Sequence, residues 1–283
     1  MTRLAWVPST NRAGPGPRTA LAVLAGKGTG LASRLLGRGG GTALPGLVAE
    51  RLDPRIVERL ASQVEAPRVV VTGTNGKTTT SRLLGAILRA AGHRPIRNGA
   101  GSNLMRGIAA TLLHEAGTGG RLPPDRPAVF EVDEATLVQA GRALRPNVLV
   151  FTNLFRDQLD RYGEIDSVAD VWREALQALL GDARIVLNAD DPLVARLSSV
   201  PEGRSVLYGI EDRSVALGEA EHASDSRWCP RCDRDYTYEA LFFGHIGWWR
   251  CSQCGDHRPT PDVGAADVRL VDDERASFSL RVG

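Results

Sequence analysis

The segment 69–80 has the clearest capacity for chemistry, because a β-branched run there meets two glycines and a lysine. Apolar residues then recur with helical spacing, so the segment predicts a strand, a tight loop and a helix. Such a loop turns backbone N–H groups toward the positive end of the helix, where a phosphate group binds. The predicted ATP-binding residues of the loop are Gly73, Thr74, Asn75, Gly76, Lys77, Thr78 and Thr79.

Two side chains of this loop have distinct expected roles. Lys77 would reach the terminal phosphates as a catalytic residue, and the Thr78 hydroxyl would face Mg²⁺. The spacing is shorter than the usual Walker pattern, because the first glycine, Gly73, stands only three residues before Gly76. A glycine-rich turn with a solvated lysine is the alternative. The preceding strand, the following helix and the Gly-Lys-Thr-Thr run argue against it.

Carboxylates close the next predicted strand, at 127–132. A phosphate-binding domain needs an acidic side chain at such a strand end, because Mg²⁺ takes hard oxygen ligands beside the β and γ phosphates. Glu131 is the first candidate for this magnesium-binding and catalytic role, and Asp133 and Glu134 are the reserve. Helix capping is the alternative for Asp133 and Glu134.

Two further polar clusters follow predicted strands. Asn153, Asp157 and Asp160 come after the strand at 147–152, where they could orient water, magnesium or phosphate, or serve as ordinary loop residues. After the strand at 184–188, the amide of Asn188 could pair with adenine and the carboxylate of Asp190 with ribose hydroxyls. Helix capping by Asp190 remains an equal alternative.

Strands alternate with helices for about 140 residues from position 68. Strands are expected at 68–72, 94–97, 127–132, 147–152, 184–188 and 204–208, and helices at 77–91, 103–115, 134–143, 167–180 and 191–198. This order predicts an α/β fold with a mostly parallel sheet and ligands at the carboxyl ends of the strands. Two more strands are expected at 268–271 and 277–282. Because the second reaches the last residues, we expect the chain to be a fragment that continues beyond Gly283.

Four cysteines lie in two Cys-x-x-Cys pairs, with 18 residues between the pairs. This spacing predicts a four-cysteine zinc ribbon inserted at 224–260. The expected zinc ligands are Cys229, Cys232, Cys251 and Cys254. Four protein ligands leave no open position, so the zinc is expected to be structural, and its binding contributes on the order of 10 kcal/mol to folding. His245 and His257 are expected to be surface or packing residues.

The charge pattern argues against nucleic-acid binding. The formal net charge is only +2, and the arginines of the ribbon are nearly balanced by acidic residues, although several ribbon aromatics could stack on bases. Residues 1–49, in contrast, are basic and hold no acidic residue. The basic residues of this arm are Arg3, Arg12, Arg18, Lys27, Arg34 and Arg38. No apolar run is long enough to span a bilayer, and no export signal is recognisable, so a cytoplasmic location is expected.

The basic arm, residues 1–66, is expected to contain short helices before the ATP-binding domain at 67–283. At 19–37, Leu21, Leu24, Leu31 and Leu35 share one helical face. We expect this face to pack against the main domain. The alternative is a peripheral contact with the inner face of the plasma membrane. Residues Gly39-Gly40-Gly41-Thr42 are expected to form a flexible loop, followed by Leu44-Pro45-Gly46, that could hold an anionic substrate or simply connect. A short helix is expected from Asp53-Pro54.

In these motifs the chain resembles the Mur ligase family, ATP-dependent amide-forming enzymes of peptidoglycan synthesis. The resemblance covers roughly residues 65–215, the central ATPase domain of the family. It depends on three motifs in this order: Gly73–Thr79, then Thr152-Asn153 with Arg156-Asp157 and Leu159-Asp160, then Asn188-Ala189-Asp190-Asp191-Pro192.

Departures from the common family pattern narrow the resemblance. Gln158 stands where a histidine is usual, Trp172 stands where a carbamylated lysine often binds magnesium, and the preceding uridine-nucleotide domain is replaced by the basic arm. Together with the cysteine module, these features look like the ligase-like subunit of lipid II isoglutaminyl synthase. That resemblance implies a heterodimer with a GatD-like glutaminase. It also places the catalytic aspartate of the family in a C-terminal domain beyond Gly283.

The implied reaction is amidation of a lipid-linked peptide. ATP would phosphorylate the α-carboxylate of D-glutamate in the lipid II stem peptide, and ammonia from the glutaminase would displace phosphate to give D-isoglutamine. The fragment alone would be inactive. Two alternatives remain open: an amino-acid ligase similar to folylpolyglutamate synthase, which the missing histidine and lysine and the zinc insertion disfavour, and a non-catalytic nucleotide-binding scaffold.

Overall fold

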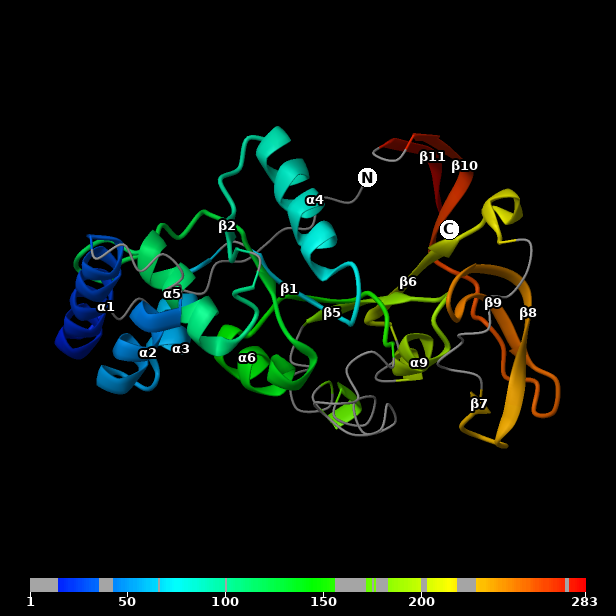
Figure 1. Cartoon of the computed structure of the whole chain (residues 1–283), viewed down its shortest axis with the longest axis horizontal. Helices are drawn as coiled ribbons and strands as arrows, with labels where there is room; N and C mark the ends of the chain where they lie inside the picture. The colour runs from blue at the N-terminus through cyan, green and yellow to red at the C-terminus, as the bar shows by residue number, and fades with distance from the viewer. Residues whose placement is uncertain are drawn as a thin grey trace. The chain divides into compact units, whose positions relative to one another are not determined.

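The computed structural model describes residues 15–35, 43–65, 67–99, 101–155, 172–174, 176, 183–199, 203–217, 228–272 and 275–283. The chain divides into two compact units, residues 1–71 with 77–148 and residues 72–76 with 149–283 (Figure 1). The predicted residues Arg3, Arg12, Arg38, Asp157, Gln158 and Asp160 lie outside the described residues.

The first unit contains a parallel three-stranded arrangement in the order β1-β3-β2. Its strands are β1 Arg68–Thr72, β2 Ile96–Arg97 and β3 Ala128–Glu131. Val69, Val70 and Val71 are buried because both faces of a parallel sheet are covered. The register pairs Val71 with Glu131, so the carboxylate of Glu131 stands at the end of β3.

This unit also contains helices. They are α1 Pro17–Leu35, α2 Ala43–Leu52, α3 Ile56–Ala61, α4 Lys77–Ala90, α5 Met105–Glu115, the 3₁₀ turn η1 Glu134–Thr136 and α6 Leu137–Leu144. The predicted strands and helices of this unit are therefore confirmed, with bounds that differ by a few residues. The loop predicted at 39–42 lies outside the described residues, and Leu44-Pro45-Gly46, for which no helix is predicted, lie in α2. Pro45 falls in the first turn of α2, where a missing N–H costs no hydrogen bond.

Helix α1 packs through a different face from the one expected. Ala22 and Val23 are fully buried, whereas Leu21, Leu24, Leu31 and Leu35 are 59%, 50%, 60% and 78% exposed. A Cβ on Gly26 would lie 3.0 Å from the Pro45 carbonyl oxygen, so small residues allow α1 to approach α2 closely. The expected packing of the leucine face is therefore wrong. Among the described residues, none of the helices is long and apolar enough to cross a membrane.

The second unit contains the remaining strands in the order β4-β5-β6-β10-β11. They are β4 Val148–Phe151, β5 Arg184–Asn188, β6 Ser205–Ile210, β10 Val263–Asp272 and β11 Arg275–Val282. β5, β6 and β10 are parallel, and β11 returns antiparallel to β10. The short helical segments are α9 Pro192–Ala195, η3 Arg196–Ser199 and η4 Arg213–Val215. These elements confirm the predicted α/β class with a mostly parallel sheet.

A separate antiparallel sheet in the second unit carries the cysteines. Its order is β7-β8-β9, with β7 Trp228–Cys229, β8 Arg234–Phe243 and β9 Ile246–Cys251. β8 and β9 form a hairpin that turns at Gly244, whose φ is +56°. A positive φ favours glycine because it has no Cβ to clash with the backbone.

Candidate functional site

The first unit brings together the two residues predicted to bind magnesium. The Thr78 hydroxyl lies 2.9 Å from each of the two Glu131 carboxylate oxygens. Thr78 stands in the first turn of α4 and Glu131 ends β3, so one helix start and one strand end place them together. Hydroxyl and carboxylate oxygens are hard ligands of the kind that Mg²⁺ takes. The donor set thus fits the ion.

The predicted catalytic lysine belongs to the same cluster. Lys77 begins α4 and is only 8% exposed, and its Nζ lies 3.3 Å from Oε1 of Glu134. A buried charge needs a partner, and the carboxylate of Glu134 supplies one. Asp133 caps η1 by accepting a hydrogen bond from the backbone N–H of Ala135, so the capping interpretation holds for Asp133. The roles of Lys77 and Glu131 toward ATP stay predictions.

Asn98 is a residue of this cluster that the sequence did not single out. It is fully buried directly after β2. Its amide Nδ2 donates to the carbonyl of Glu131 at 2.8 Å, and its Oδ1 accepts from the backbone N–H of Glu131 at 2.8 Å. These two bonds fix the backbone at the end of β3. A polar residue directly after a short predicted strand was the available signal.

In the second unit, Thr152 and Asn153, which follow β4, hold residues 73–76 of the phosphate-binding loop. Asn153 binds the Asn75 peptide on both sides: Oδ1 accepts from the Asn75 N–H at 2.8 Å, and Nδ2 donates to the Asn75 carbonyl at 3.1 Å. The Thr152 hydroxyl donates to the same carbonyl at 2.8 Å. Asn153 therefore contacts the backbone of the phosphate-binding loop, and a contact with phosphate, magnesium or water stays a prediction.

Gly73 makes the closest approach in this loop. Its φ is +133°, and an added Cβ would lie 2.1 Å from Thr152 Oγ1 and 2.8 Å from the Asn153 carbonyl oxygen. The next residue, Thr74, donates its N–H to that same carbonyl at 2.9 Å. Its hydroxyl accepts from the Phe155 N–H at 2.9 Å. The loop is thus fitted closely against residues 152–155.

The predicted adenosine-contacting residues have protein partners in the second unit. The amide of Asn188 donates to the Thr152 carbonyl at 2.9 Å, and its Oδ1 accepts from the Asp190 N–H at 3.0 Å. Asp190 pairs with Arg258 at 2.6 Å and accepts from the Ile210 N–H at 2.8 Å. Burial raises the pKa of Asp190 to about 6, and Arg258 opposes this shift. At neutral pH the buried pair is therefore charged.

Helix capping falls to the neighbouring Asp191. Asp191 is the N-cap of α9, and its side chain accepts from the N–H groups of Leu193 and Val194. The capping interpretation of Asp190 is therefore wrong. A nucleotide contact by Asn188 or Asp190 stays a prediction.

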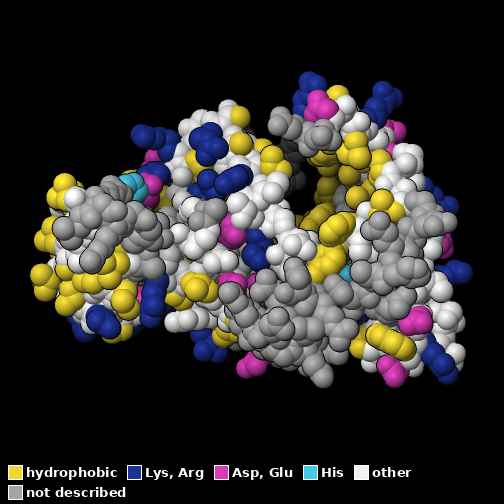
Figure 2. All heavy atoms as spheres, in the orientation of Figure 1, with side chains coloured by type: hydrophobic (Ala, Val, Ile, Leu, Met, Phe, Trp, Pro, Cys, Tyr) yellow, Lys and Arg dark blue, Asp and Glu magenta, His cyan; other side chains and the backbone are white. Residues whose placement is uncertain are grey.

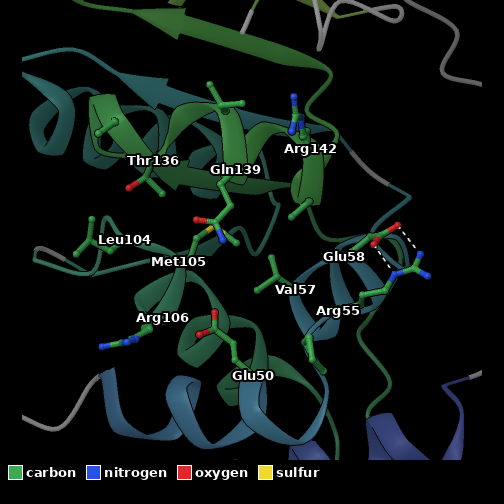
Figure 3. A pocket seen from close by; sticks show the side chains of 14 residues that line it. Glu50, Arg55, Val57, Glu58, Leu104, Met105, Arg106, Thr136, Gln139 and Arg142 are labelled. Carbon is green, nitrogen blue, oxygen red and sulfur yellow. Dashed lines mark hydrogen bonds and ion pairs between the residues drawn. The ribbon is translucent and has the colours of Figure 1, made fainter. Parts of the chain in front are cut away.

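A pocket of about 990 Å³ opens in the first unit (Figure 3). Figure 3 shows Val57, Met105 and Gln139 around the centre of the pocket, with Glu50 on the wall opposite Gln139. One wall is η1, which begins with Glu134, together with the following α6. The pocket therefore offers space beside the segment whose first residue pairs with Lys77.

The four predicted zinc ligands come together in the second unit. The Sγ atoms of Cys229, Cys232, Cys251 and Cys254 all lie within 4.8 Å of one another. A tetrahedral zinc with Zn–S bonds of about 2.3 Å places sulfurs about 3.8 Å apart, so the cluster matches this donor set. The backbone N–H groups of Cys254 and Gln253 lower the pKa of Cys251 to about 6. Such N–H groups stabilise the thiolate that zinc requires.

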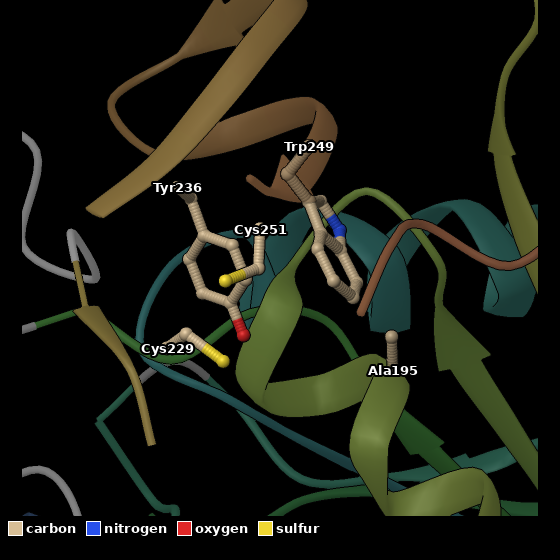
Figure 4. Close-up of a cluster of buried hydrophobic side chains, with 5 residues drawn as sticks. All are labelled: Ala195, Cys229, Tyr236, Trp249 and Cys251. Carbon is tan, nitrogen blue, oxygen red and sulfur yellow. The ribbon is translucent and has the colours of Figure 1, made fainter. Parts of the chain in front are cut away.

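The cysteine cluster also packs into the second unit. Cys229 and Cys251 join Tyr236, Trp249 and Ala195 in one buried apolar group (Figure 4). Figure 4 shows both sulfurs beside the Tyr236 ring. The indole N–H of Trp249 donates to the Ala189 carbonyl at 3.0 Å. The ribbon is thus anchored on the segment between β5 and α9.

We expect the purified protein to hold one zinc ion per chain, bound by the four thiolates. Cys232→Ser should lower the zinc content and the melting temperature, because the ribbon loses its metal and uncovers Trp249. Metal analysis and thermal unfolding measure both. His257→Ala is the matched control, since His257 is exposed and lies outside the sulfur cluster. Full zinc content in the Cys232→Ser protein would contradict the assignment.

Comparison with known proteins identifies the family. A family model described as the Mur ligase middle domain matches residues 71–229, more than half of the 283 residues. The chain belongs to the Mur ligase family. The resemblance expected from the loop and the strand-end motifs is therefore confirmed.

Two curated proteins are similar to most of this chain. The MurT subunit of lipid II isoglutaminyl synthase (glutamine-hydrolyzing) from Staphylococcus aureus strain COL is 38% identical over 227 residues, which cover 80% of this chain and 49% of that protein. The MurT subunit from Streptococcus pneumoniae strain R6 is 33% identical over 265 residues, 93% of this chain and 57% of that protein. The chain thus spans about half the length of the curated relatives it matches.

A solved Mur ligase structure shares the fold. The chain superposes on crystal structure I of MurF from Acinetobacter baumannii with a TM-score of 0.54 and 17% sequence identity, covering 83% of this chain and 40% of the MurF chain. The identity is too low for the superposition to say more than that the fold is common to both.

Proposed function

We propose that this chain is the nucleotide-binding part of an ATP-dependent carbon–nitrogen ligase that amidates lipid II in peptidoglycan synthesis. The contact that supports nucleotide binding is the Thr78 hydroxyl against both Glu131 carboxylate oxygens at 2.9 Å. The acceptor and the amide donor are proposed from the similarity to MurT subunits. In this proposal residues 67–283 form the ATP-binding domain, 224–260 form its zinc-ribbon insertion, and 1–66 form a basic arm.

The proposed reaction has two steps. The γ-phosphoryl group of ATP passes to the α-carboxylate of D-glutamate in the stem peptide, giving an acyl phosphate and ADP. Ammonia, released from glutamine by a glutaminase subunit, then attacks the acyl carbon and forms the C–N bond. The C–O bond to the phosphate breaks, inorganic phosphate leaves with its electron pair, and the nitrogen loses a proton. The product is D-isoglutamine. This chain has to stabilise the negative charge that moves with the phosphoryl group.

The residues of the chain divide this work. The N–H groups of the loop 73–79 bind the phosphates, and Lys77 supplies positive charge to the terminal phosphates. Glu134, now 3.3 Å from the Lys77 ammonium, holds it until nucleotide binds. Thr78 and Glu131 would hold Mg²⁺, which neutralises charge on the β and γ phosphates. Asn98 keeps the Glu131 backbone in place through its two hydrogen bonds.

The decisive experiment uses the natural gene product that contains this chain, with and without a glutaminase subunit. Lipid II, Mg-ATP and either ammonium or glutamine are supplied, and mass spectrometry follows the stem peptide while ADP is measured. We expect amidation with ammonium in either case, and amidation with glutamine only when the glutaminase is present. Addition of an amino acid instead of an amide would favour the folylpolyglutamate synthase type. ATP that is bound but never hydrolysed would favour a scaffold.

We also propose that α1 rests on the cytoplasmic surface of an anionic membrane. Its exposed leucine face, Leu21, Leu24, Leu31 and Leu35, lies opposite the face that packs against α2, and Figure 2 shows apolar side chains gathered there. Residues 1–49 hold six basic residues and no acidic one. An exposed apolar face in a segment whose sequence has an excess of basic residues fits a negatively charged lipid surface, and the proposed acceptor is itself a lipid.

This proposal predicts binding to vesicles of phosphatidylcholine with phosphatidylglycerol, but not to phosphatidylcholine alone. Leu31→Glu with Leu35→Glu should lower the bound fraction about tenfold, because charges replace the inserted side chains. Vesicle flotation measures the bound fraction of the protein. Leu83→Glu with Ile87→Glu is the control, since these α4 residues are 61% and 64% exposed with the same spacing. Equal vesicle binding by the two double variants would contradict the proposal. A dimer of the parent protein that dissociates only in the α1 double variant would also contradict it.

A further inference from the structure

The tip of the ribbon hairpin, residues 243–245, contacts Phe155. Phe155 follows β4 and the two residues, Thr152 and Asn153, that bind the phosphate-binding loop. The ring of Phe155 contacts two tip residues, with ring centroids 5.4 Å from Phe243 and 4.4 Å from His245. Phe155 is 8% exposed. These contacts join the zinc ribbon to a segment nearly 90 residues earlier in the chain, within the same unit.

Gly244 lets the tip approach this closely. A Cβ on Gly244 would lie 2.6 Å from Cε1 of Phe155, a distance that real Cβ atoms do not adopt. Its φ of +56° also favours glycine. The turn therefore presses directly against the Phe155 ring.

His245 makes a second connection through a buried carboxylate. Its Nε2 lies 3.3 Å from Oδ2 of Asp191, and both side chains are fully buried. The same Oδ2 accepts the backbone N–H of Leu154 at 2.8 Å. The expectation that His245 is a packing residue is met, but its partner is the carboxylate that holds the residue next to Phe155.

Residues 154 and 155 in turn fix the phosphate-binding loop. The Phe155 N–H donates to the Thr74 hydroxyl at 2.9 Å, and the preceding Asn153 binds the Asn75 peptide with both ends of its amide. A displacement of Phe155 would break the bond to Thr74 and move the backbone that carries Asn153. The tip therefore has one short path to the loop.

We propose that the ribbon tip, Phe243–His245, positions the phosphate-binding loop, so that the structural zinc module sets the affinity of this protein for nucleotide. This proposal rests on the proposed nucleotide function. Phe243, Gly244 and His245 act through Phe155 and Asp191 and are positioning residues. The zinc ribbon thus holds the phosphate-binding loop in position, in addition to being a folded insertion.

The test compares two glycine substitutions in the natural gene product. Gly244→Ala pushes a methyl group into Phe155, whereas Gly203→Ala also replaces a glycine with positive φ, +83°, but meets nothing within 4 Å. Calorimetric titration with Mg-ADP should show Kd raised about tenfold by Gly244→Ala and unchanged by Gly203→Ala. Zinc content should stay the same in both variants, and the melting temperature should fall further in Gly244→Ala, which adds the contact with Phe155 to the strain of a positive φ.

A compensating substitution separates positioning from general destabilisation. Leucine at position 155 has no atom corresponding to Cε1, so Gly244→Ala combined with Phe155→Leu should bind Mg-ADP more tightly than Gly244→Ala alone. Such coupling is expected only between residues in contact. Removal of zinc from the parent protein should also raise Kd, because the tip loses its support. This second measurement covers the case in which Gly244→Ala does not fold.

The outcomes distinguish the two proposals. If the parent protein binds no Mg-ADP, the proposed nucleotide function fails. If the parent binds it, and both zinc removal and Gly244→Ala leave Kd unchanged, the nucleotide function stands and the positioning role of the tip is wrong.

Discussion

Gly73→Ala is expected to abolish nucleotide binding. The new Cβ would lie 2.1 Å from Thr152 Oγ1 and within 2.9 Å of the Asn153 backbone nitrogen and oxygen, so the loop has to leave its present position. The substituted residue would also have to adopt a φ of +133°. Strain of this kind costs about 1–3 kcal/mol, to which the lost bonds to Asn75 and Thr74 add. We expect Kd for Mg-ADP to rise by at least about a hundredfold, as measured by calorimetry.

Gly92→Ala is the matched control. Gly92 also has a positive φ, +85°, but a Cβ there meets nothing within 4 Å. Gly92→Ala should lower stability through backbone strain alone, by less than Gly73→Ala, and leave nucleotide affinity intact. If Gly73→Ala binds Mg-ADP as tightly as the control, the loop does not depend on its contact with residues 152–155, and the proposed site is in doubt.

The sequence predicted the strands and helices whose pattern is local. The β-branched run of β1 and the helical spacing of α4 are determined by neighbouring residues, and both elements lie where they were expected. Helix α2 was missed because Pro45 and Gly46 are read as helix breakers. In the structure, a Cβ on Gly46 would lie 2.1 Å from the Arg106 carbonyl oxygen, so glycine is there to let α5 approach. That reason depends on a residue 60 positions away, which periodicity does not reveal.

The same limit explains the face of α1 that packs. Hydrophobic periodicity favours the large leucines as the buried face, but close packing against α2 selects Gly26 and Ala22 instead. Size complementarity between two helices decides the orientation, and it is a property of the pair.

The sequence predicts candidate site residues where a motif has few roles other than binding a ligand. Two Cys-x-x-Cys pairs and a Gly-Lys-Thr-Thr run indicate metal and phosphate sites by their chemistry alone. Asn98 and Asp191 are common polar residues, and only the fold shows that each holds a backbone segment of the site. His245 gave no signal, because its connection to the loop passes through Asp191 and Leu154.

Glu131→Gln is expected to remove magnesium-dependent phosphoryl transfer while the fold persists. Glutamine keeps the size of the side chain and can still pair with the Thr78 hydroxyl, now 2.9 Å from both carboxylate oxygens. It lacks the negative charge that a magnesium ligand needs at this position. Because Asn98 holds the Glu131 backbone, the substituted side chain starts from the same backbone position. Magnesium-dependent ATP turnover should fall by at least about a hundredfold.

ADP formation is measured as a function of magnesium concentration in the natural gene product. The affinity for ADP is measured separately in the absence of magnesium. Affinity for metal-free ADP should change little, since the loop N–H groups are untouched. Glu115→Gln is the control: Glu115 belongs to the same unit, where it pairs with Arg126, and lies outside the cluster. Magnesium-dependent turnover that is equal in the two variants would show that Glu131 is not the ligand. The acidic role would then pass to Glu134, whose carboxylate lies beside the Lys77 ammonium.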